Sequence, residues 1–263
     1  MGTTAREILA AKQFAAMSAI VYKHGPQPSK NSSKSPRCDL NSVIKEWTFL
    51  DHESITNKPN KPLEQNAGKK APWDGTLTYR IWYRTIDSGQ KQIALVFRGT
   101  YLLNDWWSNL RWITNWFQFG WDQYDLTRAV ANYVDTDLIN DTPELQGNGE
   151  PEIIAVGHSL GGGLAQQAGY ASEKINRVYS FNGSAVTGFY SANKSKRTRE
   201  VLSTKRIYRI GERGEVLAIF RNIMRTIYPV LEKNPKIVEV TYNFGEFGLI
   251  RNHSISDLAC ALE

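Results

Sequence analysis

The pentapeptide Gly157-His158-Ser159-Leu160-Gly161 has the residue types of an activated serine. It follows the short apolar run 153–156, which is typical of a buried strand, and it precedes a run of good helix formers. This pattern between a strand and a helix is typical of a nucleophile elbow, a strained turn that holds the serine hydroxyl above the sheet. Both glycines are needed, because a Cβ would clash where the helix approaches the strand. The same pattern also occurs in turns without chemistry, so a base, an acid and an oxyanion hole are needed beside Ser159.

The general base must come from only four histidines, His24, His52, His158 and His253. In hydrolases with this elbow the chain order is serine, acid, histidine. His24 and His52 precede the serine, and the ring of His158 cannot easily reach back to the neighbouring hydroxyl. Only His253 follows, between an expected loop over 245–252 and an expected helix over 254–262. We predict that His253 is the base, since imidazole titrates near neutral pH; the alternative is an exposed or helix-capping histidine.

Two glutamates are alternatives for the acid that orients the base. Residues 206–210 alternate between polar and apolar types, which predicts a strand, and the turn after it carries Glu212 and Glu215. The acid must accept a hydrogen bond from one ring nitrogen of His253. We prefer Glu215, because the apolar segment 216–220 behind it could anchor the loop. Glu212 could instead pair with a nearby arginine on the surface.

An oxyanion hole needs two backbone N–H groups. The residue after the nucleophile, Leu160, supplies one of them in elbow hydrolases, and a loop after an earlier strand supplies the other. Residues 92–97 are such a strand and lead into Arg98-Gly99-Thr100. We predict Thr100 as the second donor, with Gly99 allowing a tight turn.

These motifs together resemble the class 3 lipases, the fungal-lipase-like branch of the α/β-hydrolases. The resemblance rests on the segments 96–100, 105–106, 109–110 and 157–162, with weaker similarity over 10–22 and 180–183. It spans most of residues 5–260, and the spacing from Thr100 to Ser159 and from Ser159 to Glu215 suits the family. The family usually has an aspartate as the acid, where this chain has a glutamate, and residues 24–76 are not matched.

Strand and helix patterns alternate along the chain. Residues 76–85 and 92–97 predict a hairpin across 87–90, and 236–244 predicts a further strand. Helices are expected over 5–22, 122–134, 163–172 and 216–231. This alternation predicts an α/β fold with a mostly parallel central sheet covered by helices on both faces, and the resemblance makes it an α/β-hydrolase fold. We expect one domain over 1–263, with a polar, loop-rich insertion around 24–76 and an aromatic, lid-like segment around 101–124.

Aromatic residues gather in that lid-like segment. Five of the eight tryptophans lie between Trp106 and Trp121. Core packing is one interpretation, and it is the better one for Trp106 and Trp112. The other is an acyl-chain groove or a contact with a lipid interface, where tryptophan is favoured because its ring is apolar and its N–H can stay wet. The predicted substrate-binding residues are Trp106, Trp107, Trp116 and Phe117.

The net charge is +6, and positive residues gather in the last third of the chain. They include Lys194, Lys196, Arg197, Arg199, Lys205, Arg206 and Arg209. A solvated face is the simpler interpretation. If the charge has a partner, an anionic phospholipid surface fits better than nucleic acid, for which the sequence has no recognition motif.

Composition is that of a globular protein, with 41% hydrophobic and 22% charged residues. No apolar run approaches the roughly 20 residues that cross a bilayer, and charged residues interrupt the N-terminal stretch where a signal peptide would lie. We therefore expect a cytoplasmic protein or one exported without a cleavable signal. Cys38 and Cys260 could be free thiols or one bridge.

These observations predict hydrolysis of lipid esters by a lipase or phospholipase A, through an acyl-enzyme intermediate on Ser159. The mechanism needs no metal and no organic cofactor. Alternatives are a short-chain esterase, a thioesterase or an acyltransferase on the same scaffold, or a lipid-binding module without catalysis.

Overall fold

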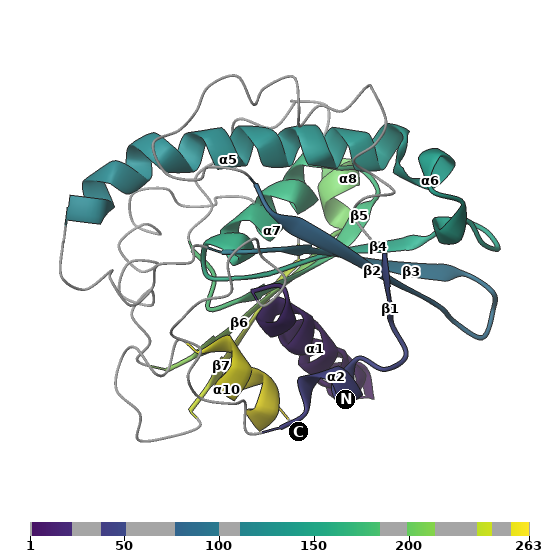
Figure 1. Ribbon diagram of the computed structural model, residues 1–263, viewed down its shortest axis with the longest axis horizontal. Coiled ribbons are helices and arrows are strands. Elements are labelled where there is room, and N and C mark those ends of the chain that lie inside the picture. The colour runs from purple at the N-terminus through teal and green to yellow at the C-terminus, as the bar shows by residue number, and fades with distance from the viewer. Residues whose placement is uncertain are drawn as a thin grey trace.

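The computed structural model describes residues 2–22, 38–50, 77–99, 111–184, 199–213, 236–243 and 254–262. In these residues seven strands form one mixed sheet in the order of the sequence (Figure 1). They are β1 (Thr48–Leu50), β2 (Tyr79–Thr85), β3 (Lys91–Phe97), β4 (Glu152–His158), β5 (Ile175–Phe181), β6 (Arg206–Glu212) and β7 (Lys236–Tyr242). Strands β1, β2 and β3 pair antiparallel, and the pairs from β3 to β7 are parallel.

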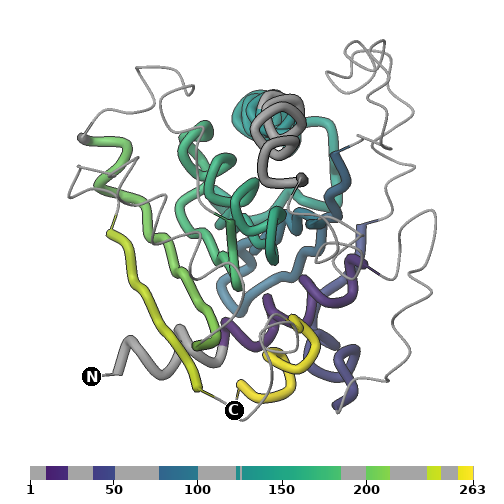
Figure 2. The backbone as a smooth tube through the Cα atoms, turned by 90° about the vertical axis from the view of Figure 1, so that its left-hand side faces the viewer, coloured from purple at the N-terminus to yellow at the C-terminus, as the bar shows by residue number. Residues whose placement is uncertain are grey.

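Helices lie on both sides of this sheet. Figure 1 shows α5 (Arg111–Thr136), α6 (Leu138–Asp141), α7 (Leu160–Ala171) and α8 (Arg199–Ser203) on one side. The other side carries α1 (Gly2–Ile20), α2 (Leu40–Val43) and α10 (Ile255–Ala261). A short 3₁₀ turn, Pro143–Leu145, precedes β4. The side view in Figure 2 gives the same three layers, which confirms the predicted α/β fold.

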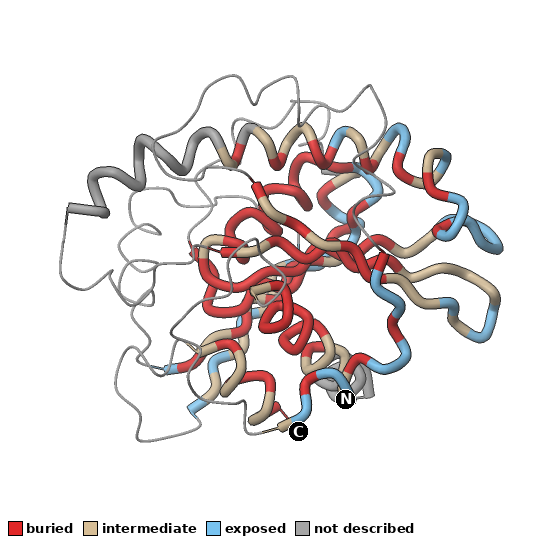
Figure 3. The backbone as a smooth tube through the Cα atoms, viewed as in Figure 1, coloured by how far each residue is buried: buried red, intermediate tan, exposed pale blue. Residues whose placement is uncertain are grey.

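Each central strand contributes to two cores, because successive side chains point to opposite faces of a sheet. Ala94 and Val96 belong to a cluster with α1 and α10, whereas Ile93 and Leu95 belong to one with α5 and α7. Strands β3 and β4 are therefore apolar almost throughout, as expected of strands covered on both faces. Figure 3 shows this burial concentrated in the central strands, α1 and α7.

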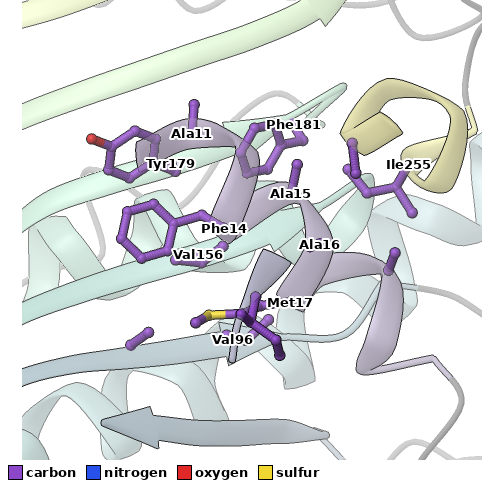
Figure 4. Close-up of a cluster of buried hydrophobic side chains, with 14 of the residues drawn as sticks. Ala11, Phe14, Ala15, Ala16, Met17, Val96, Val156, Tyr179, Phe181 and Ile255 are labelled. Carbon is purple, nitrogen blue, oxygen red and sulfur yellow. The ribbon is translucent and has the colours of Figure 1, made fainter. Parts of the chain in front are cut away.

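Helix α1 packs closely on the sheet through small and aromatic side chains (Figure 4). Ala11 and Ala15 are fully buried, and the ring of Phe14 lies 4.6 Å from that of Tyr179 on β5. Phe14 also meets Trp47 edge to face at 5.8 Å. This packing fixes the helix, and Val21 and Tyr22 follow directly at its C-terminal end.

The predicted hairpin is confirmed. Thr85 pairs with Lys91, and the Ile86 N–H donates to the Gln90 carbonyl at 3.0 Å. Gly89 closes the turn with φ +79°, a conformation that glycine adopts at little cost.

Several elements differ from the expectations. Helix α5 begins at Arg111 and so includes part of the predicted lid-like segment. Helix α1 begins at Gly2 instead of residue 5. Strand β1 lies inside the segment interpreted as an insertion, where Phe49 packs on Trp82 of β2. Three residues are too few for a recognisable alternation in the sequence. The strand is recognised by its pairing with β2. The expected helix over 216–231 lies outside the described residues.

The two cysteines form a disulfide. Cys38 and Cys260 are 222 residues apart in sequence, and their Cα atoms are separated by 5.6 Å. The bridge joins the chain before α2 to α10, which both lie on the same side of the sheet as α1. The position of α10 is therefore covalently tied to the N-terminal part of the fold.

Candidate active site

Ser159 occupies the turn between β4 and α7 by itself. The strand ends at His158, the helix begins at Leu160, and Ser159 between them has φ 58° and ψ −126°. Residues other than glycine rarely adopt a positive φ, and holding such a residue in this conformation costs on the order of 1–3 kcal/mol. Only 3% of Ser159 is exposed. The predicted strand–turn–helix geometry is confirmed.

Close backbone approach explains the glycines on both sides of Ser159. A Cβ at Gly157 would clash with the carbonyl group of Gly161. A Cβ at Gly161 would clash with the carbonyl oxygen of Phe97, the last residue of β3. The first turn of α7 is thus pressed against β4 and the end of β3, so the predicted steric need for glycine is confirmed.

Hydrogen bonds with the end of β5, with Ser184 after it and with α7 hold the elbow in place. The Ser159 N–H donates to the Phe181 carbonyl at 3.0 Å, and the Ser184 N–H donates to the Ser159 carbonyl at 3.0 Å. The Gly162 N–H donates to the same carbonyl at 3.0 Å. Both backbone groups of Ser159 are therefore bonded, so the strained turn is held by its surroundings.

The two predicted oxyanion segments lie next to one another. Leu160 is the first residue of α7, and the N–H groups of a first helical turn have no partner within the helix. A Cβ at Gly161 would come within 2.9 Å of the Gly99 nitrogen, so the chain after β3 runs beside the elbow. Thr100, the predicted second donor, lies outside the described residues.

Glu212 is the last residue of β6, and only 5% of it is exposed. Its expected position on the surface is therefore wrong. Its backbone N–H donates to the side-chain oxygen of Asn182 at 2.9 Å, and the Asn182 N–H donates to the Ile210 carbonyl at 2.8 Å. Asn182 directly follows Phe181, the residue that binds the Ser159 N–H. Glu212 thus lies at the carboxyl end of β6, at the same edge of the sheet as the Ser159 elbow. Glu215 lies outside the described residues.

The predicted base, His253, lies outside the described residues, but the helix after it is confirmed. Ser254 caps α10, with its hydroxyl accepting from the Asp257 N–H at 3.3 Å. His253 immediately precedes this cap in the sequence.

Of the predicted substrate-binding residues, Trp106 and Trp107 also lie outside the described residues. Trp116 and Phe117 lie on α5, whose backbone alone is described there.

His158 is buried and contacts Tyr22. Its Nδ1 lies 3.3 Å from the Tyr22 hydroxyl oxygen, and the two rings meet edge to face. This contact supports the exclusion of His158 as the base, since its ring is directed at the end of α1. Sequence analysis missed Tyr22, because 136 residues separate it from its partner and no local pattern marks the contact.

Two residues of the positive segment have structural partners. Lys205 is 1% exposed, and its ammonium donates to the carbonyls of Ser172 and Ile175 at 2.6 and 2.9 Å. It therefore adds nothing to a surface patch, which corrects its inclusion there. Arg209 forms an ion pair with Glu239 at 3.2 Å and donates to Gln166.

Nothing in the described parts of the chain gathers three or more His, Cys, Asp or Glu side chains that could hold a metal ion. No helix among the described residues combines the length and apolar character that crossing a bilayer requires.

The fold and this turn define an α/β protein with a strained serine between a parallel strand and a helix. A family model described as "Domain of unknown function (DUF6792)" matches residues 48–210, more than half of the chain, so the protein belongs to this family. The matched segment includes Ser159 and ends before Glu212, Glu215 and His253. No curated protein matches the chain.

Proposed function

We propose that this protein is a serine hydrolase that cleaves carboxylic ester bonds of lipids, as a lipase or phospholipase A. The proposal extends the observed α/β architecture to an α/β-hydrolase fold, in line with the resemblance to class 3 lipases. The observation that carries it is the backbone of Ser159, which has a positive φ between β4 and α7.

The alternative for a serine at this position is a helix cap. Serine is common at the start of helices because its hydroxyl accepts a hydrogen bond from a nearby N–H. The Ser159 side chain makes no such bond, although Ser159 is the residue directly before α7. Its conformation is costly for a serine and its hydroxyl does not serve the helix, so glycine would be the better residue for folding alone. A role in chemistry explains why serine is present.

The position of Ser159 also suits a nucleophile. In open α/β sheets, binding sites lie beyond the carboxyl ends of the parallel strands. Ser159 follows the carboxyl end of β4, flanked by β3 and β5. The N-terminus of α7 adds a partial positive charge, which favours a developing oxyanion.

In the proposed reaction, His253 removes the proton from the Ser159 hydroxyl, which attacks the ester carbonyl. The N–H groups of Thr100 and Leu160 stabilise the oxyanion. His253 then protonates the leaving alcohol, and water activated by the same imidazole releases the fatty acid. Glu215 orients His253, with Glu212 as the alternative acid.

The proposed substrate is a lipid because aromatic residues follow the predicted oxyanion segment in the sequence. Trp106, Trp107, Trp116 and Phe117 would contact the acyl chain. The basic residues of the last third of the chain other than Lys205 and Arg209 would favour an anionic membrane surface. No metal or organic cofactor takes part in the proposed steps.

Labelling with a fluorophosphonate probe tests the nucleophile. We expect the wild type and Ser18→Ala to be labelled and Ser159→Ala to remain unlabelled. Ser18 is a matched control, since it is another buried serine, on α1. A folded wild type that is not labelled, also in detergent, would leave a lipid-binding module as the better interpretation.

Product analysis then tests the substrate class. The purified protein is incubated with mixed membrane lipids, and the products are measured by mass spectrometry. Free fatty acid with lysophospholipid indicates phospholipase A, and free fatty acid from triacylglycerol alone indicates a lipase. Activity restricted to short-chain p-nitrophenyl esters or to thioesters would contradict the lipid substrate while keeping the serine hydrolase.

A further inference from the structure

The Tyr22 hydroxyl lies between the two backbone segments of the proposed oxyanion hole. Tyr22 follows the C-terminal end of α1, and its ring is partly buried against the core under that helix. The hydroxyl oxygen lies 3.3 Å from His158 Nδ1, one residue before Ser159. It is also hydrogen-bonded to the backbone of Gly99, two residues after the end of β3.

The direction of the hydrogen bond between Tyr22 and Gly99 follows from chemistry. The Gly99 N–H donates to the phenol oxygen, because the bond lowers the pKa of Tyr22, as donation to the oxygen does. Burial outweighs this bond and raises that pKa far above its usual value, so the phenol keeps its proton. The hydroxyl can therefore donate to His158 Nδ1 while it accepts from Gly99, when His158 carries its proton on Nε2.

The space around Gly99 leaves little freedom for a different arrangement. A Cβ at Gly99 would clash with the Tyr22 hydroxyl and would lie 2.7 Å from the His158 carbonyl oxygen. The chain after β3, the phenol and the elbow thus meet at one point. Arg98 adds a further constraint, since its N–H donates to the Thr78 carbonyl at 2.9 Å.

We propose that Tyr22 is a positioning residue, whose hydroxyl holds the chain after β3 at a set distance from the Ser159 elbow. The inference deepens the proposed esterase function and rests on it. The peptide unit after Gly99 carries the predicted Thr100 donor, and Leu160 follows Ser159. Oxyanion donors stabilise the transition state best when they are already in position before the reaction begins. The link that Tyr22 makes between the two segments should therefore affect kcat.

The test compares Tyr22→Phe with Tyr79→Phe. Tyr79 is a matched control, because it is a buried tyrosine on β2 that belongs to the core on the opposite face of the sheet. We measure kcat and KM on a p-nitrophenyl ester, the rate constant of fluorophosphonate labelling, and the midpoint of thermal unfolding. Tyr22→Phe keeps the ring and removes only the hydroxyl.

We expect Tyr22→Phe to lower kcat and the labelling rate about 10- to 100-fold, less than the about 10²–10³-fold loss of a complete oxyanion donor. KM should stay within about twofold, because the ground-state ester gains little from these donors. A purely structural role would instead lower the unfolding midpoint and leave kcat of the folded enzyme unchanged.

Two variants of His158 provide an independent check. Asn has a side-chain oxygen as many bonds from its Cα as Nδ1 of His, so His158→Asn can still accept from Tyr22. His158→Leu cannot, and we expect it to lose as much kcat as Tyr22→Phe, with His158→Asn retaining more. An active wild type whose Tyr22→Phe variant matches Tyr79→Phe in kcat overturns the role of Tyr22 alone. A wild type without labelling or hydrolysis overturns the proposed function, and this role with it.

Discussion

The backbone N–H of Glu212 donates to the side-chain oxygen of Asn182 at 2.9 Å and thereby joins the end of β6 to the end of β5. Asn182 follows Phe181, whose carbonyl binds the Ser159 N–H. The ends of three parallel strands are thus linked around the serine. Glu212 is buried at this edge of the sheet, so experiments can distinguish it from Glu215 as the acid.

The first prediction separates these two glutamates. We expect Glu215→Gln to lower kcat/KM by about 10³- to 10⁴-fold, because loss of the triad acid leaves His253 in the wrong tautomer. Its unfolding midpoint should remain close to that of the wild type. Glu212→Gln should mainly lower that midpoint, since it alters a buried side chain. Steady-state kinetics and thermal unfolding of both variants check this, and a reversed pattern would assign the acid to Glu212.

Replacing the strained serine by glycine should stabilise the fold. Ser159→Gly and Ser159→Ala both abolish the proposed hydrolysis, but only glycine adopts φ 58° without strain. We expect Ser159→Gly to be more stable than Ser159→Ala by about 1–2 kcal/mol, the lower part of the cost of such a conformation. Chemical denaturation measures the difference. Equal stabilities would mean that the turn relaxes in the variants.

Reduction of the disulfide should weaken both the fold and the proposed activity. The Cys38–Cys260 bridge closes a loop of most of the chain, and we expect its loss to cost about 2–5 kcal/mol. Activity should fall as well, because α10 directly follows His253. Thermal unfolding and ester hydrolysis with and without reductant check this. The Cys38→Ser/Cys260→Ser variant should reproduce the reduced protein and no longer respond to reductant.

Stability should fall steeply above pH 10. Burial raises the pKa of Tyr79 to about 12 and that of Tyr124 to about 12 as well. Above pH 10 the unfolded chain releases the phenol protons while the folded chain keeps them, so the free energy of unfolding decreases as the pH rises. A pKa that is about two higher in the folded than in the unfolded chain corresponds to roughly 3 kcal/mol of stability per tyrosine at most.

Urea unfolding between pH 8 and pH 12 measures this loss. Tyr79→Phe should show a smaller decrease than the wild type, because one phenol that ionises only after unfolding is gone. An unchanged slope for this variant would show that Tyr79 is not the source of the decrease.

The sequence by itself determined the elements whose patterns are local. The apolar run before Gly157 marked β4, the alternation over 206–210 marked β6, and residues 87–90 marked the hairpin. The elbow at Ser159 was also predictable, because its two glycines and its strand-to-helix change lie within a few residues. Helix and strand periods are encoded in neighbouring side chains, so they need no knowledge of distant partners.

Only the tertiary structure decided the relationships between distant residues. Cys38 is bonded to Cys260, and Tyr22 contacts His158. Lys205 is buried with its ammonium bonded to two carbonyls, and Glu212 is buried instead of lying on the surface. Each of these depends on the order of the strands and on which helix covers which face. That order is set by packing of the whole core, whose contacts join residues far apart in sequence and leave no local pattern to read.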